Sequence, residues 1–189
     1  WEADSSISFQ MKALGLKSHA DLQAWMNQKV GNYLRPKGKI LIGWDEIIEL
    51  SEQVGAPKDA AVMVWRDSKW AFEAAKKGHQ VILSPENFLY FDHYQDLGPS
   101  EPEAIGNYTS LKDVWEYKPF EQIRTKSNQK KLTQEIKSRI LGIQANLWTE
   151  YMPTWKQVEY MLFPRFFALA ERSWQGEVQL ETESAEKSW

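Results

Sequence analysis

The sequence predicts an α/β domain built around a parallel sheet, on two observations. Four short apolar runs have the length and composition of buried strands, and they lie at 39–44, 60–65, 80–84 and 140–147. Segments whose apolar residues recur at helical spacing separate these runs. Strands that alternate with helices form parallel β/α units joined by right-handed crossovers. Functional side chains in such folds lie where the carboxyl ends of the strands meet the loops that follow them.

Helices are expected between and around these strands. Ser18, followed three residues later by Asp21, has the pattern of a capping box, and the helix that it starts should end at the Arg-Pro-Lys-Gly sequence of 35–38. Gly78 is the expected stop of one helix, and Pro85 ends the third strand. Helices are further expected at 47–54, 68–77, 129–137 and 158–174, with a helical turn at 111–115. The acidic and polar tail after Gln175 is expected to be partly mobile.

Length and composition narrow the classes of function. The 189 residues suffice for one domain with a core but are few for a complete barrel enzyme. A net charge of −3 with scattered Lys and Arg argues against a nucleic-acid partner, and no run reaches the ~20 apolar residues of a membrane helix. A secretory leader is expected to be absent or already removed. With no cysteine and three histidines far apart in sequence, we expect no disulfide, metal site or cofactor, and we place His79 and His93 at the surface.

Tryptophan is the unusual component, with ten residues in the chain. Three of the apolar runs end in a tryptophan with an acidic residue one or two positions later, in ILIGWDE, AVMVWRD and IQANLWTE. The third strand has no tryptophan but leads to Tyr90 and Asp92. An aromatic face beside a hydrogen-bond acceptor suits a sugar ring, so four such strand ends predict a sugar pocket. The alternative, a tryptophan-rich core, is our interpretation of Trp25, Trp70 and Trp174.

Taken in order, GWDEI, VMVWRD, VILSP with LYFDHYQ, LGIQANLWTEY and VEYMLFPRFFALAERSW resemble segments of the family 20 glycoside hydrolases, the β-N-acetylhexosaminidases. QANLWTEY with the following FPR and ALAE is highly specific, whereas GWDE alone would be weak. The resemblance implies a partial (β/α)8 TIM barrel, in which these segments correspond to strands five to eight with their helices. Residues 1–174 would form the C-terminal half of the catalytic barrel, and 175–189 a polar tail. The family resemblance alone suggests a periplasmic or extracellular location.

The resemblance also implies that these residues lack the catalytic acids. The family's Asp-Glu pair follows strand four in a His-x-Gly-Gly-Asp-Glu motif, which does not occur here, and the first two residues resemble a segment just past that pair. Asp45 and Glu46 match the strand-five GWDE of the family, whose acids are not the proton donor. Asp67 is expected to form a local ion pair with Arg66 at the rim. We therefore expect residues 1–189, taken alone, to be inactive.

Six positions match substrate-contacting residues of the family. Trp44, Trp65 and Trp148 resemble the tryptophans that box the acetamido methyl group of the substrate. Tyr90 matches the tyrosine that donates to the acetamido oxygen and aligns it. Asp92 and Glu150 match the carboxylates that accept hydrogen bonds from sugar hydroxyls. The alternatives are a loop anchor for Tyr90 and a loop cap for Glu150.

Two hypotheses of function remain at this point. The first is part of an exo-acting β-N-acetylhexosaminidase, which removes terminal N-acetylhexosamine from glycans by substrate-assisted retaining catalysis. The second is a non-catalytic sugar-binding or assembly module. Half a barrel leaves two strand edges unpaired and its inner face open, so we also expect self-association, with a homodimer as one form.

Overall fold

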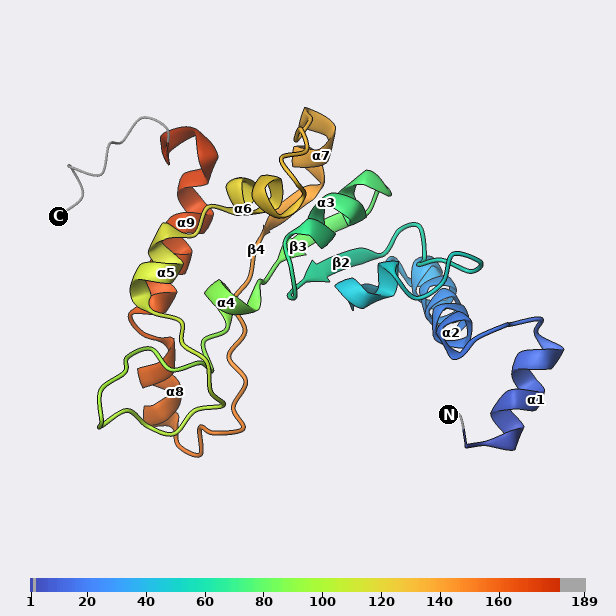
Figure 1. Ribbon diagram of the computed structural model, residues 1–189, viewed down its shortest axis with the longest axis horizontal. Helices are drawn as coiled ribbons and strands as arrows, with labels where there is room; N and C mark the ends of the chain where they lie inside the picture. Colours follow the sequence, from blue (N-terminus) through green and yellow to red (C-terminus); the bar gives the residue numbers. More distant parts are fainter. Residues whose placement is uncertain (2, 181–189) are drawn as a thin grey trace.

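A parallel four-stranded sheet forms the centre of the computed structural model, which describes residues 1 and 3–180 (Figure 1). The strands are β1 (Ile42–Trp44), β2 (Ala61–Val64), β3 (Gln80–Leu83) and β4 (Ile140–Ile143), and they lie side by side in chain order. Every neighbouring pair is parallel. The predicted α/β class with a parallel sheet is confirmed.

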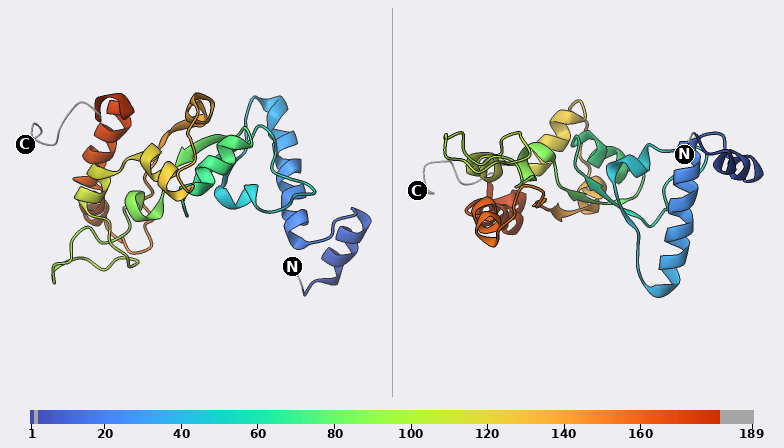
Figure 2. Two further views of the ribbon diagram at one scale, coloured as in Figure 1. Left: turned by 45° about the horizontal axis from the view of Figure 1, so that its top comes forward. Right: turned by 90° about the horizontal axis from the view of Figure 1, so that it is seen from below.

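Helices cover one face of the sheet and also lie beyond its two outer strands, β1 and β4. α3 (Lys69–Lys76), α6 (Pro119–Lys126) and α7 (Gln134–Arg139) share the face on which the main core forms (Figure 1). Beyond β1 lie α1 (Ser5–Ala13), α2 (His19–Leu34) and the 3-10 turn η1 (Arg35–Lys37). At the opposite end lie α5 (Leu111–Glu116), α8 (Trp155–Leu162) and α9 (Arg165–Leu180), as Figure 2 also shows. Two short elements, η2 (Asp45–Ile48) and α4 (Glu86–Leu89), follow β1 and β3.

The core lies between the central strands and α3. The strand residues that point towards the helix are fully buried, namely Val62, Val64, Val81 and Leu83. Against them α3 places the small side chains of Ala71, Ala74 and Ala75, which let the helix backbone lie close to the sheet. Each buried valine or leucine contributes about 1.5–3 kcal/mol to the stability of the fold. This packing fixes the positions of the carboxyl ends of β2 and β3.

The outer strands are less buried than the sequence predicts. Ile42 of β1 is 49% exposed and Leu141 of β4 is 55% exposed. Within the part of the chain that the structure describes, β1 and β4 each pair with a strand on one side only. The prediction that 39–44 is buried on both faces is therefore wrong, because Ile42 and Trp44 share one face of β1 and both are exposed there.

The helix boundaries show which local signals are decisive. The capping box is confirmed, with Ser18 Oγ accepting from the Asp21 amide and the Asp21 carboxylate accepting from the Ser18 amide. The expected helix 158–174 is two helices, because Pro164 has no N–H to continue the ladder. The expected helix 129–137 begins only at Gln134, since Asn128 and Gln129 have positive φ angles of 57° and 59°.

Other predicted elements are shorter than expected. The helix predicted at 47–54 is only η2, because the Ser51 hydroxyl takes the Val54 amide and so closes a turn in place of the helical ladder. The strand predicted at 140–147 ends at Ile143. α1 was not predicted. α9 continues to Leu180, so residues 176–180 of the expected tail are helical, and 181–189 lie outside the described residues.

Three predictions of burial are wrong. His79 and His93 are both buried, and the His79 Nδ1 atom lies 3.0 Å from the Ala60 carbonyl oxygen. Of the tryptophans assigned to the core, Trp25 and Trp70 are half-buried, but Trp174 is 92% exposed. Among the helices that the structure describes, none is long and apolar enough to cross a membrane.

Candidate functional site

The loops at the carboxyl ends of the strands enclose a cavity of about 390 Å³. Trp65 directly follows β2, Tyr90 and Asp92 follow β3 and α4, and Trp148 and Glu150 follow β4. All five of these predicted residues line the cavity. The sixth, Trp44, ends β1 and lies beside it, with its ring centroid 6.3 Å from that of Trp148. The structure therefore brings together residues that are up to 106 positions apart, from Trp44 to Glu150.

The indole of Trp65 is held in a fixed orientation by its neighbours. Its Nε1–H donates to both carboxylate oxygens of Glu46, at 3.1 Å each. On its other side, its ring lies 6.3 Å from the Tyr90 ring, with 30° between the two planes. Because the polar edge of the indole is satisfied by Glu46, its apolar face is left as a wall of the cavity.

Asp45 supports the end of β2 and does not face the cavity. It is fully buried, and its Oδ1 lies 2.6 Å from Arg66 Nε. Its Oδ2 accepts from the backbone amides of Trp65 and Arg66. Arg66 also pairs with Glu49, so the predicted Arg66–Asp67 ion pair is wrong. Asp67 instead accepts from the Lys69 amide at the start of α3.

Tyr90 is held beside β4 by Asn146. The two form an isolated parallel bridge, in which the Asn146 amide donates to Leu89 and the Phe91 amide donates to Asn146. The Asn146 side chain is also fixed, since its Nδ2 donates to Ser84 and its Oδ1 accepts from Gln144. Burial raises the pKa of Tyr90 to about 12, so its hydroxyl keeps its proton and can donate at neutral pH. Sequence reasoning had not singled out Asn146 or Gln144, although both lie in the QANLW segment.

Asp92 is a carboxyl group of the cavity that the fold shields from water. It is buried, and its Oδ1 has no hydrogen-bond partner among the described residues. Burial raises its pKa to about 6, and the charges of Glu150 and Glu86 add to this rise, while the charge of Arg165 opposes it. A buried oxygen without a partner carries a cost that a ligand hydroxyl can remove. Asp92 is therefore ready to accept a hydrogen bond from a polar ligand.

Three further polar side chains, Glu86, His93 and Asn107, line the cavity. Asn107 Nδ2 donates to Glu86 Oε1 at 3.1 Å, and His93 Nε2 lies 3.9 Å from the same oxygen. His93 Nδ1 contacts Thr109 Oγ1 at 3.0 Å. Burial, with the charge of Arg165, lowers the pKa of His93, so the ring is neutral at pH 7. The sequence does not single out Asn107 as a site residue, because it lies in an irregular loop without periodicity.

Residues 1–177 match the model of the glycosyl hydrolase family 20 catalytic domain. The chain belongs to this family. It is 38% identical to a β-hexosaminidase of Porphyromonas gingivalis over 92% of this chain and 21% of that protein. It is 30% identical to a β-hexosaminidase of Vibrio furnissii over 90% of this chain and 26% of that protein.

Solved structures of family 20 confirm the partial barrel. An exo-β-N-acetylglucosaminidase of Vibrio harveyi, in complex with N-acetylglucosamine, superposes with a TM-score of 0.82 and 28% identity, over 98% of this chain and 27% of that chain. The β-N-acetylhexosaminidase of Bacteroides fragilis matches with a TM-score of 0.69. The chain thus spans about a quarter of the length of the relatives that it matches. β1 to β4 are one part of a TIM barrel, and the cavity lies at the face where such barrels carry their active sites.

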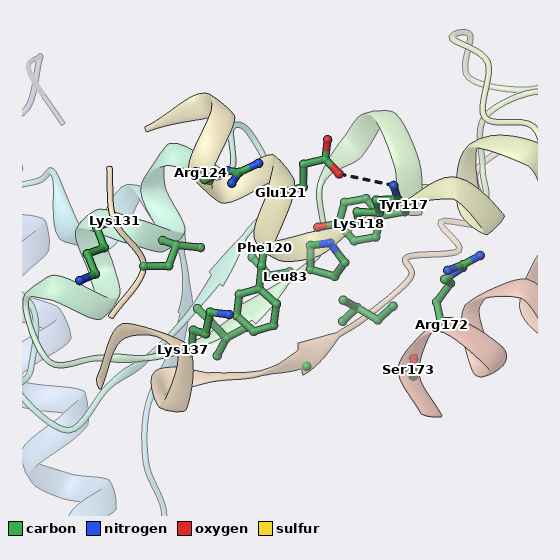
Figure 3. A pocket seen from close by; sticks show the side chains of 15 residues that line it. Leu83, Tyr117, Lys118, Phe120, Glu121, Arg124, Lys131, Lys137, Arg172 and Ser173 are labelled. Carbon is green, nitrogen blue, oxygen red and sulfur yellow. Dashed lines mark ion pairs between the residues drawn. The ribbon is translucent and has the colours of Figure 1, made fainter. Parts of the chain in front are cut away.

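A larger cavity, of about 520 Å³, lies on the helical side of this family 20 sheet (Figure 3). Its floor is apolar and includes Leu83 and Phe120, and Figure 3 shows Arg124, Lys131 and Arg172 around it. Lys118 at its rim pairs with Glu121 at 3.6 Å. None of the six predicted site residues lines it. The smaller cavity, which all but one of the predicted residues line, is therefore the candidate site.

Proposed function

We propose that the protein to which these residues belong hydrolyses terminal N-acetylhexosamine residues from glycans. The observation that carries this proposal is the cavity itself, which has two indole walls, one phenol donor and carboxylate acceptors. This set of groups matches an acetamido sugar, which has an apolar methyl group, an amide oxygen and several hydroxyls. The complex of the Vibrio harveyi relative with N-acetylglucosamine supports the choice of sugar.

Each group would have one task in substrate-assisted retaining catalysis. Trp65 and Trp148, with Trp44 behind them, would enclose the acetamido methyl by dispersion contacts. The Tyr90 hydroxyl would donate to the acetamido oxygen and so hold it under the ring, where it attacks the anomeric carbon. A protein carboxylate is then not needed as the nucleophile. Asp92 and Glu150 would accept hydrogen bonds from the hydroxyls of the terminal sugar.

The proton donor would come from outside residues 1–189. The one adjacent Asp-Glu pair in the sequence is Asp45-Glu46. The Asp45 oxygens are occupied by Arg66 and two amides, and those of Glu46 by the Trp65 indole. Neither acid is free to protonate a leaving group. We therefore propose that residues 1–189 alone bind the sugar weakly and do not hydrolyse it.

An activity assay with p-nitrophenyl N-acetylglucosaminide tests the absence of the acid. The polypeptide of residues 1–189 should release no nitrophenol above background, and steady turnover would contradict the proposal. A calorimetric titration of the same polypeptide with N-acetylglucosamine tests the pocket. We expect a dissociation constant of about 1 mM or weaker, which corresponds to about −4 kcal/mol.

Matched variants separate a specific pocket from general aromatic stickiness. Trp148→Ala should abolish the binding of N-acetylglucosamine, since it removes one wall. Trp174→Ala should leave it unchanged, because Trp174 is exposed on α9 and does not line the cavity. Equal losses in both variants would contradict the assigned site. The alternative function is a non-catalytic sugar-binding module. It would require that the whole protein binds N-acetylglucosamine as tightly as residues 1–189 do and shows no turnover.

A further inference from the structure

Arg165, the first residue of α9, is the largest fully buried side chain of the described residues. Its guanidinium donates to four backbone carbonyl oxygens: those of Phe91 at 2.6 Å, Met161 at 2.6 Å, Thr109 at 2.9 Å and His93 at 3.1 Å. These carbonyls come from three separate segments, which are the loop after α4, the loop before α5 and the end of α8. One side chain therefore ties together three segments around the cavity.

Two of the four carbonyls frame the sugar-facing residues. Phe91 lies between Tyr90 and Asp92, and His93 follows directly. With the carbonyls on both sides of Asp92 held by one rigid guanidinium, the backbone from which the Asp92 side chain extends is fixed. The Arg165 guanidinium also lies over the Phe91 ring, 4.8 Å from the centroid. The peptide that carries Tyr90 and Asp92 is thus held from one side by Arg165 and from the other by Asn146.

The charge of Arg165 acts on the same group. Burial lowers its pKa to about 10, so the guanidinium remains protonated at neutral pH. No carboxylate forms an ion pair with it among the described residues, and its Nε has no hydrogen-bond partner there. Its positive charge lowers the pKa of Asp92, against the effects of burial, Glu150 and Glu86.

We infer that Arg165 is a positioning residue for sugar recognition, which fixes the backbone of Tyr90 and Asp92 through the carbonyls of Phe91 and His93. This inference rests on the proposed function, since it assigns the role to the same cavity. Arg165 does not line the cavity itself. It acts through the backbone that it holds.

Two variants separate the geometry of Arg165 from its charge. Arg165→Lys keeps the charge but cannot reach four carbonyls with a planar fork. Arg165→Gln removes the charge. Arg172→Gln is the matched control, because Arg172 is a partly buried arginine on the same helix, lies over Trp115 and lines the other cavity. A carboxyl-carbon NMR titration of Asp92 measures the effect of charge, and amide exchange at Phe91 and Thr109 measures how firmly the loops are held.

We expect Arg165→Lys to leave the Asp92 pKa near 6 and to speed amide exchange at Phe91 and Thr109. Binding of N-acetylglucosamine should weaken roughly tenfold, the lower end of the loss seen when residues that orient the ligands of metal sites are removed. Arg165→Gln should raise the Asp92 pKa further, with Glu86, Glu150, Tyr90 and His93 left in place around it. Arg172→Gln should change neither the Asp92 pKa, nor amide exchange at Phe91 and Thr109, nor the binding of N-acetylglucosamine. If Arg165→Gln does not fold, Arg165→Lys alone still tests the geometry.

Results of the opposite kind would overturn the inference. A folded Arg165→Lys variant with unchanged exchange at Phe91 and Thr109 would show that Arg165 does not hold the loops. Lower thermal stability with unchanged sugar affinity would reduce Arg165 to a structural residue. The exchange and pKa measurements need no sugar, so they remain decisive if the unmodified polypeptide fails to bind N-acetylglucosamine, which would contradict the proposed function instead.

Discussion

Replacing Asp92 with asparagine should stabilise the protein while it weakens sugar binding. The pKa of Asp92 is about 6 in the folded protein, against an ordinary value of 3.8. A shift of about two pH units corresponds to about 3 kcal/mol of preference for the protonated form in the folded state. Because Asp92 is 6% exposed, little of this effect is lost to solvent screening. The asparagine amide imitates the neutral acid and removes this cost.

The pH dependence gives the prediction its sign. A carboxyl whose pKa is raised by folding binds more protons in the folded state between about pH 4 and pH 6, so stability falls as the pH rises through this interval. Urea unfolding of Asp92→Asn and the unmodified polypeptide should therefore give nearly equal free energies at pH 3.5. At pH 8 the variant should be more stable by about 1–3 kcal/mol. A variant that is less stable at pH 8, or a difference that is the same at both pH values, would refute the reasoning.

Three further predictions concern the scaffold around the cavity. Asp45→Ala should destabilise the fold by about 3 kcal/mol in urea unfolding, because it removes the buried partner of Arg66 Nε and the shared acceptor of the Trp65 and Arg66 amides. Glu49→Ala, which removes a more exposed partner of Arg66, should cost less than about 1 kcal/mol, and similar losses in the two variants would contradict the assigned roles. Ser18→Ala should lower the unfolding free energy by about 1 kcal/mol through loss of the capping box, and an unchanged midpoint would contradict this. We also propose that residues 1–189 self-associate through the exposed edges at Ile42 and Leu141. Light scattering at rising concentration should then give a mass above the monomer mass of 22.1 kDa, and a constant monomer mass would count against the proposal.

The parts of the fold that sequence predicts well are those set by local patterns. The central strands were recognisable because Val62, Val64, Val81 and Leu83 lie in short apolar runs with turn residues on either side. The six residues proposed for the site could be named because strand ends of parallel sheets converge, and because the resemblance assigned each of them a counterpart. Pro164 by itself indicates a helix break, but the apolar residues recur at helical spacing on both sides of it and so predict one helix over 158–174.

The parts that sequence reasoning missed depend on distant contacts. His93 is expected at the surface from the sequence alone, but Glu86 of α4, Thr109 of the loop before α5 and Arg165 of α9 surround it. In the sequence, Arg165 falls inside the single helix expected at 158–174, with no role assigned to it. Its burial follows from four backbone carbonyls that become acceptors only when the loops are folded, and no pattern in the sequence records that.

The central claim is that the cavity between Trp65 and Trp148 recognises the acetamido group. The most direct measurement is an NMR titration of residues 1–189, with assigned indole N–H signals, against N-acetylglucosamine and against glucose. N-acetylglucosamine should shift the signals of Trp65 and Trp148 in a saturable manner, glucose should leave them unchanged at equal concentration, and Trp174 should respond to neither. Equal shifts with both sugars, or shifts at Trp174 in place of Trp65, would contradict the account.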